Sequence, residues 1–257
     1  HPNLFAHNNG LLYSNGRDKA VTWMNSQAYG HPIIPRSGYI VEFNALYYNA
    51  KKFYQQMLVD SDNPMHHVVA ESIEEECKLF ETNFRSTFLN EHGYLFDYVD
   101  GQACDWSVRP NQLLAIALDF SPLTLKERKG VLDICTRELK TPKGIRSLSP
   151  KSGGYTPYYV GHQQQRDYAY HQGTAWPWLT GFYLEAYLRV YKMSGVNYIE
   201  RQLIGFEEEL FYHCVGTIPE LFDGNPPFSG RGAISFAMNV SGILRAIRLL
   251  EKHRAEA

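Results

Sequence analysis

Two acidic side chains, Glu220 and Asp223, occur in a segment rich in proline and glycine, where the sequence reads PELFDG. No regular element is predicted around them, so they have no evident structural role. Carboxylates that converge from separate loops are what hydrolysis of a glycosidic bond needs, because one protonates the leaving oxygen and the other activates a water molecule. In inverting enzymes they stand about 6.5–9.5 Å apart. This segment therefore predicts glycoside hydrolysis.

Amide, cationic and aromatic side chains that suit a sugar occur in two other long loops. One contains Asp105, Arg109, Asn111 and Gln112; the other ends in HQGTAWPW at residues 171–178. Buried amides need hydrogen-bond partners, which sugar hydroxyls can supply, and tryptophan rings accept the C–H face of a pyranose. The alternatives are an Asp105–Arg109 ion pair and simple packing of the rings. Both loops are candidate parts of a sugar site.

Two further groups of polar residues have weaker functional interpretations. Glu42 and Asn44 stand at the start of a predicted helix, where Glu42 also suits the positive end of the helix dipole. His171 could serve as a metal ligand or base, but no second histidine lies nearby at ligand spacing. We therefore expect no metal and no other cofactor.

Composition excludes several classes of protein. The 257 residues include 25 basic and 27 acidic side chains, a balance that argues against nucleic-acid binding. No apolar run of about 18 residues is present, so no membrane span is expected. The four cysteines, at positions 77, 104, 135 and 214, form no CxxC pair, which predicts reduced thiols and a cytoplasmic protein. The 14% of aromatic residues is the first indication of a sugar-binding function.

The elements that must position these residues are predicted to be helices. Apolar periodicity predicts seven of them, at residues 41–59, 65–89, 110–120, 124–139, 175–193, 196–214 and 233–252. Thr124 followed by Glu127 predicts a capping box at the start of the fourth. Buried and charged helices alternate, and each buried helix follows one of the long loops. This alternation predicts an all-α array of helical hairpins, a toroid with a site at its mouth, with an open solenoid as the alternative.

Six segments, taken together, resemble the C-terminal glucosidase domain of glycogen debranching enzymes, the amylo-α-1,6-glucosidases. They are VTWMN at 21–25, PRSGYIVEFNALYYNA at 35–50, SVRPNQLLAIAL at 107–118, GIRSLSP at 144–150, RDYAYHQGTAWPWL at 166–179 and PELFDG at 219–224. They follow the family's order over roughly residues 13–250. The resemblance implies an (α/α)6 toroid that removes a single α-1,6-linked glucose from glycogen or a similar branched α-glucan, with inversion and without a metal.

The resemblance assigns the general base to Glu220 and places Asn25 where the family has its general-acid aspartate. An amide cannot donate a proton as a carboxylic acid does, so activity is in doubt. The accounts left open are an inactivating substitution, a natural loss of catalysis with binding kept, or another acid among Asp18, Glu42 and Asp105. We favour a natural departure in a divergent member.

The resemblance also implies sugar-binding roles for a larger set of loop residues. They are Trp23, Arg36, Glu42, Asn44, Asp105, Arg109, Asn111, Gln112, His171, Gln172, Trp176 and Trp178. A glucan-binding toroid without catalysis is the second hypothesis, and a helical scaffold that binds protein is the third. The concentration of tryptophan, amide and arginine side chains in the loops argues against the scaffold.

The helix count adds an expectation about domain organisation. A ring of six hairpins needs more helices than the seven predicted, so residues 1–257 are expected to form its C-terminal part. The inner helices would then be exposed unless an N-terminal segment that completes the toroid, or a partner, covers them.

Overall fold

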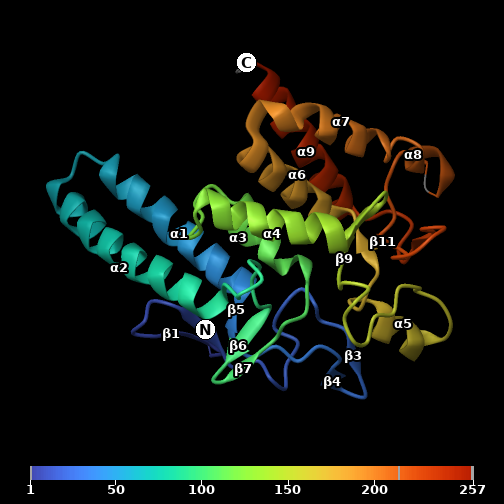
Figure 1. Ribbon diagram of the computed structural model, residues 1–257, viewed down its shortest axis with the longest axis horizontal. Helices are drawn as coiled ribbons and strands as arrows, with labels where there is room; N and C mark the ends of the chain where they lie inside the picture. The colour runs from blue at the N-terminus through green and yellow to red at the C-terminus, as the bar shows by residue number, and fades with distance from the viewer. Residues whose placement is uncertain (1, 214, 256–257) are drawn as a thin grey trace.

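The computed structural model describes residues 2–213 and 215–255 and contains one long helical hairpin beside a group of other helices (Figure 1). The helices are α1 (Val41–Val59), α2 (Pro64–Phe88), α3 (Leu114–Ala117), α4 (Leu125–Glu138), α5 (Gln163–Ala169), α6 (Trp178–Tyr191), α7 (Val196–Ile204), α8 (Glu209–Tyr212) and α9 (Ala237–Ala255). Short 3₁₀ turns, Pro110–Leu113 and Lys192–Gly195, precede α3 and α7. The helical part of the prediction is therefore confirmed.

The α1–α2 hairpin is specified by local sequence. Helix α2 begins with Pro64 after the cap residue Asn63, whose side chain accepts a hydrogen bond from the Met65 N–H (3.0 Å). Its buried face includes Phe80 and Phe84, four positions apart, and Phe80 stacks on Tyr48 of α1 with 5.1 Å between ring centroids. These apolar contacts hold the two helices together.

The long loops contain short strands, so the all-α description is not confirmed. The first sheet has the order β1 (Leu4–Ala6), β2 (Leu12–Ser14), β5 (Gly38–Ile40), β6 (Tyr98–Asp100), β7 (Ala103–Cys104). The second has the order β12 (Gly230–Arg231), β11 (Leu221–Phe222), β10 (Ala175–Trp176), β9 (Gly144–Arg146), β8 (Lys140–Thr141). The third pairs β3 (Gln27–Ala28) with β4 (His31–Pro32). All pairings are antiparallel, and they supply partners for backbone groups of the loops.

These sheets bring distant loops together beside the helices. In the first sheet, Tyr39 pairs with Val99, which joins the loop before α1 to the loop before α3. In the second, Ala175 pairs with both Arg146 and Phe222, which joins the loops before α6 and α9. In Figure 1 the strands extend from β1 at the left, through β5, β6 and β7, to β9 and β11 at the right. Strand pairing thus joins the long loops in two pairs.

Several predicted helix boundaries are wrong, for local reasons. Helix 110–120 is divided into a 3₁₀ turn and α3, which ends at Ala117. Helix 175–193 begins only at Trp178, because residues 175–176 pair as β10. Helix 196–214 ends at Ile204, just before Gly205, and continues only as the short α8. Helix 233–252 begins at Ala237. In contrast, Thr124 and Glu127 form the predicted capping box of α4.

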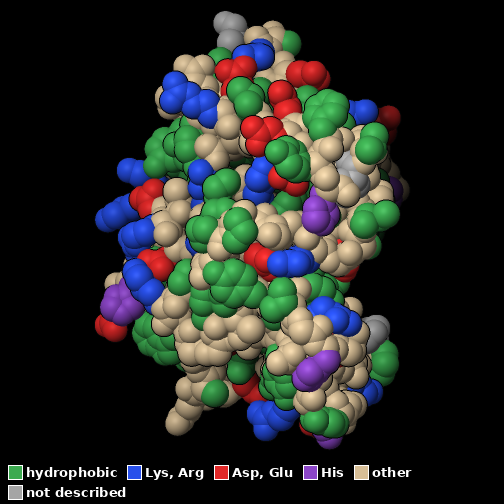
Figure 2. Space-filling model, turned by 90° about the vertical axis from the view of Figure 1, so that its right-hand side faces the viewer, with side chains coloured by type: hydrophobic (Ala, Val, Ile, Leu, Met, Phe, Trp, Pro, Cys, Tyr) green, Lys and Arg blue, Asp and Glu red, His purple; other side chains and the backbone are tan. Residues whose placement is uncertain are grey.

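The remaining sequence expectations concern cysteines and membranes. Cys77, Cys104 and Cys135 are free thiols, whereas Cys214 lies outside the described residues. In the part of the chain that the structure covers, no helix has the length and apolar character needed to cross a membrane. The face with α5, α8 and β11, on the right in Figure 1, carries groups of hydrophobic side chains separated by charged ones (Figure 2).

Helices α6 and α9 pack closely because glycines face each other. A Cβ atom on Gly242 would lie 2.7 Å from the Cα and carbonyl oxygen of Trp178, and one on Gly181 would lie 2.5 Å from the carbonyl oxygen of Gly242. Backbone atoms cannot move away as flexible side chains do. These two positions therefore require glycine.

We predict that Gly242→Ala destabilises the protein by about 1–3 kcal/mol, because the added methyl group forces α9 away from α6. Chemical denaturation would measure the free energy of unfolding. Gly153→Ala is the matched control, since nothing lies within 4 Å of a Cβ atom at Gly153. Greater stability of Gly242→Ala, as helix propensity alone would give, would contradict the close packing.

Candidate functional site

A buried ion network joins the loop before α1 to the loop before α3. The Arg36 guanidinium, 1% exposed, donates two hydrogen bonds to the Glu42 carboxylate. Its Nε lies 2.8 Å from Asp97 Oδ2, at ion-pair distance but outside hydrogen-bond geometry. Burial lowers the pKa of Arg36, but Asp97 and Glu42 outweigh that effect and leave the pKa raised. Arg36 therefore stays charged and fixes the start of α1.

Asp97 also contacts two residues at the start of the 3₁₀ turn before α3, Arg109 and Asn111. Asn111 Nδ2 donates to Asp97 Oδ1 (2.7 Å), and Arg109 Nε lies 3.9 Å from Asp97 Oδ2. Burial raises the pKa of Asp97, and the two arginines oppose that shift. A buried carboxylate is costly to ionise without such partners, so Asp97 and the arginines must be present together.

Arg109 extends the network to the loop before α6. Its guanidinium donates to the backbone oxygens of Ser147 (3.2 Å) and His171 (3.0 Å), and to Gln172 Oε1 (2.8 Å). Burial lowers the pKa of Arg109, with Asp97 opposing. Four predicted sugar-site residues, Arg36, Arg109, His171 and Gln172, are thus linked through one chain of contacts.

Trp23, two residues before Asn25, belongs to an aromatic cluster. Its indole N–H donates to Asn111 Oδ1 (2.6 Å). The ring lies edge-on to His171, Trp176 and Trp178, at centroid distances of 5.0, 5.6 and 5.2 Å. Trp176 is buried, whereas Trp23 and Trp178 are half-buried. The partly exposed pair can contact a ligand, and the buried Trp176 ring packs against Trp23.

His171 forms the centre of this cluster and is almost completely buried. Its ring stacks on Trp176 (5.5 Å between centroids, 11° between planes), and its Nδ1 lies 3.2 Å from Ser26 Oγ. Burial, together with the nearby Arg109, lowers the pKa of His171 to about 3. The imidazole is therefore neutral near pH 7 and fixes Ser26, the neighbour of Asn25.

Glu220 lies against the other side of the same cluster. The Tyr170 hydroxyl donates to Glu220 Oε1, and the Ala233 N–H donates to Oε2 (2.8 Å). The Tyr170 ring contacts His171 and Trp176 at 4.5 and 4.9 Å between centroids. Burial and the Glu220 carboxylate raise the pKa of Tyr170, which keeps its hydroxyl protonated as a donor. The carboxylate is half-buried and held in one orientation.

The backbone at Glu220 is fixed by α9. Asn239 Nδ2 donates to the carbonyl oxygens of Pro219 (2.6 Å) and Glu220 (2.7 Å), and its Oδ1 accepts from the Trp178 N–H (3.0 Å). One buried amide therefore sets the position of Glu220 relative to Trp178. Gly232 leaves room for the carboxylate, because a Cβ atom there would lie 2.3 Å from Glu220 Oε2.

The other acidic candidates have different surroundings. Asp223 is buried, accepts from the Tyr159 N–H (2.8 Å) and pairs with Arg231 (2.8 Å). Asp105 is half-buried and accepts from the Ser107 N–H (2.8 Å). Asp18 and Asn25 are exposed, and their side chains make no hydrogen bond to another described residue. Within residues 2–213 and 215–255, no three histidine, cysteine or acidic side chains are placed to hold a metal ion.

Two predicted sugar-binding amides contact backbone groups. Asn44 Oδ1 accepts from the Leu12 N–H (2.8 Å), and its Nδ2 donates to the carbonyl oxygens of Leu12 (2.9 Å) and Ile40 (3.0 Å). Gln112 accepts from the Leu95 N–H (3.1 Å) and donates to the Arg109 oxygen (3.0 Å). Both are buried, and their principal contacts position the loops.

Sequence reasoning missed Asp97, Tyr170 and Asn239. Tyr170 stands inside the segment RDYAYHQGTAWPWL, so its neighbourhood was recognised although its role was not. Asp97 stands in FDYVD, where nothing in the sequence identifies its partners, because Arg36 is far away along the chain.

Comparison with known proteins gives one family and several structures. The family model described as amylo-alpha-1,6-glucosidase matches residues 4–245. The glycogen debranching enzyme of Saccharomyces cerevisiae is 26% identical over 219 residues, which cover 69% of this chain and 14% of that protein. The chain therefore spans only about one seventh of this curated relative.

Two solved structures share the fold. Neutral trehalase from Saccharomyces cerevisiae is similar with a TM-score of 0.60 at 16% identity, covering 89% of this chain and 42% of the trehalase. The GH63 mannosylglycerate hydrolase from Thermus thermophilus has a TM-score of 0.54 at 15% identity, covering 81% of this chain and 45% of that one. The chain matches less than half of each structure.

The buried neutral His171 predicts a loss of stability in acid. Its pKa is about 3 in the folded protein and 6.5 as the unperturbed value, so the unfolded state binds more protons between these pH values. We expect His171 to reduce the free energy of unfolding by about 2 kcal/mol between pH 7 and pH 5. Urea denaturation of wild type and His171→Gln at both pH values would measure it; an equal loss in the two proteins would contradict the buried neutral imidazole.

Proposed function

Because the chain belongs to the amylo-alpha-1,6-glucosidase family, we propose that it acts as a glycoside hydrolase on α-1,6-linked glucose at the branch points of a glycogen-like glucan. The observation that carries this proposal is the setting of Glu220. Its carboxylate is held by Tyr170 and the Ala233 N–H beside the cluster that contains Trp23 and His171. A fixed carboxylate next to partly exposed tryptophans suits a sugar site.

In the proposed reaction, Glu220 is the general base. The two hydrogen bonds that its oxygens accept orient the carboxylate, which can take a proton from water. The water then attacks the anomeric carbon from the face opposite the leaving group, and the configuration inverts. Trp23 and Trp178 would contact the glucose ring, while Gln172, oriented by Arg109, would bind its hydroxyls. No metal or other cofactor takes part in this proposal.

The leaving oxygen must be protonated as the water attacks, and here this chain departs from the family pattern. Asn25 stands at the proposed acid position and has no proton to give. Glu42 is occupied by its two hydrogen bonds from Arg36, so it is a poor substitute. A missing general acid costs about 10²–10⁴-fold in rate. We therefore propose slow hydrolysis, and Asn25 also favours a second function, glucan binding with negligible turnover.

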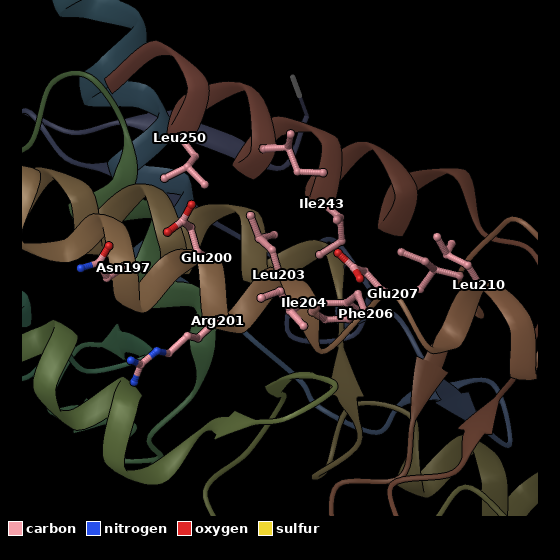
Figure 3. Close-up of a pocket in the computed structure, with 12 residues that line it drawn as sticks. Asn197, Glu200, Arg201, Leu203, Ile204, Phe206, Glu207, Leu210, Ile243 and Leu250 are labelled. Carbon is pink, nitrogen blue, oxygen red and sulfur yellow. The ribbon is translucent and has the colours of Figure 1, made fainter. Parts of the chain in front are cut away.

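We further propose that residues 1–257 are part of an (α/α)6 toroid. Helix α1 leaves Leu46, Phe53 and Met57 exposed. A pocket of about 580 Å³ beside α7, α8 and α9 is lined mainly by apolar side chains, as Figure 3 shows for Leu203, Phe206, Leu210, Ile243 and Leu250, together with Asn197, Glu200, Arg201 and Glu207. Apolar faces of this kind require a cover. Helices outside residues 1–257 would provide it, in the same protein or in a partner.

One prediction of this proposal concerns Asn25. Asn25→Asp should increase the release of free glucose from a branched limit dextrin by about 10²–10⁴-fold, because it restores a proton donor. Glucose would be followed with a coupled enzymatic assay on the full-length protein. Gln27→Glu is the control, since it adds an exposed carboxylate two positions away. No glucose from either wild type or Asn25→Asp would exclude hydrolysis.

Another prediction of this proposal concerns Glu220. Glu220→Gln should abolish turnover in the Asn25→Asp background while leaving maltooligosaccharide binding nearly unchanged, because the amide keeps the shape but not the basicity. Calorimetry would report binding, and the glucose assay would report turnover. Glu207→Gln is the control, on a different part of the surface. Undiminished turnover by Glu220→Gln would remove Glu220 from the role of base.

A further inference from the structure

A second hollow of about 550 Å³ lies outside the cluster around Glu220. It is formed by the loop before α3, the C-terminal turn of α4 and the loop after β9. Its lining includes His92, Tyr94, Trp106, Arg137, Glu138 and Lys151. The loops that form it are those that Arg109 connects to the candidate site, since the Ser149 N–H donates to the Val108 oxygen (3.0 Å). The hollow therefore has the same rigid support as that site.

Trp106 stands out among the four tryptophans of the chain because it is 46% exposed. The Tyr94 hydroxyl donates to its carbonyl oxygen (3.0 Å), and its ring lies edge-on to Phe96, with 4.6 Å between centroids and 85° between planes. His92 approaches at 5.8 Å. A large aromatic ring held firmly yet left half in water is typical of a binding surface.

Charged side chains of both signs surround Trp106. Glu138 is 5% exposed and accepts from Lys151 Nζ (2.7 Å), Arg137 Nε (3.1 Å) and Ser149 Oγ (3.1 Å). The lining thus holds two cationic side chains, Arg137 and Lys151, and one anionic side chain, Glu138. Hydrogen-bond donors beside an exposed aromatic ring suit a polyhydroxylated ligand.

We propose that this hollow is a second glucan-binding site. The exposed face of Trp106 supports one glucose unit, and Arg137 and Lys151, which Glu138 holds in place, bind its hydroxyls. The choice of glucan as ligand rests on the proposed function, whereas the site itself rests on the geometry of Trp106. Because the site lies apart from Glu220, it engages a different chain of the same branched polymer and raises affinity for large glucans more than for short ones.

Affinity electrophoresis of the full-length protein in gels containing glycogen tests the proposal. Trp106→Ala should weaken glycogen binding about tenfold, as loss of an aromatic anchor does, while calorimetry with maltotetraose at the candidate site stays unchanged. Trp106→Tyr should retain part of the affinity, because it keeps an aromatic face. Tyr212→Ala, which removes an 86% exposed ring from α8, is the control.

A second variant tests the same site without changing Trp106. Lys151→Gln changes a side chain that is 76% exposed and should also weaken glycogen binding. Wild-type affinity for glycogen in both Trp106→Ala and Lys151→Gln would overturn the site. Failure of the proposed function is seen separately: Asn25→Asp would release no glucose, while the loss of glycogen binding by Trp106→Ala would remain.

Discussion

The candidate site depends on the ion pairs and the hydrogen bond that the buried Asp97 carboxylate makes. This carboxylate lies among Arg36, Arg109 and Asn111, each of which reaches a different part of the chain. A carboxylate at this depth is strongly destabilising without partners, and so is each arginine, so the loops that carry them must come together as a set. Removing one member leaves an uncompensated charge in the interior. The network thus converts long irregular segments into a rigid frame.

Short strands act together with the ion network to position the loops. The second sheet places β10, which ends at Trp176, between β9 and β11, and Glu220 directly precedes β11. Asn239 then ties the Glu220 backbone to the first turn of α6 through the Trp178 N–H. The tryptophans and the carboxylate are therefore positioned by backbone hydrogen bonds. Positions set in this way are more exact than flexible loops alone would give.

Sequence reasoning predicted the elements that local chemistry determines. The hairpin of α1 and α2 and the capping box at Thr124 depend on periodicity and neighbouring residues, and they were found at nearly the right bounds. The strands were missed because segments of two or three residues show no alternation to detect. The role of Asp97 was missed because its partners are distant in sequence, and the backbone contacts of Asn44 depend on a fold that its own segment does not reveal.

We propose that Glu220 and the segment around Asn25 face the same glucosyl unit across the cluster of Trp23, Tyr170 and His171. A crystal structure of the full-length protein soaked with a branched oligosaccharide tests it most directly. We expect electron density for a glucose ring against Trp23 and Trp178, with its α-1,6 oxygen beside Asn25 and a water molecule on Glu220. A sugar bound elsewhere, with only solvent at Glu220, would contradict it.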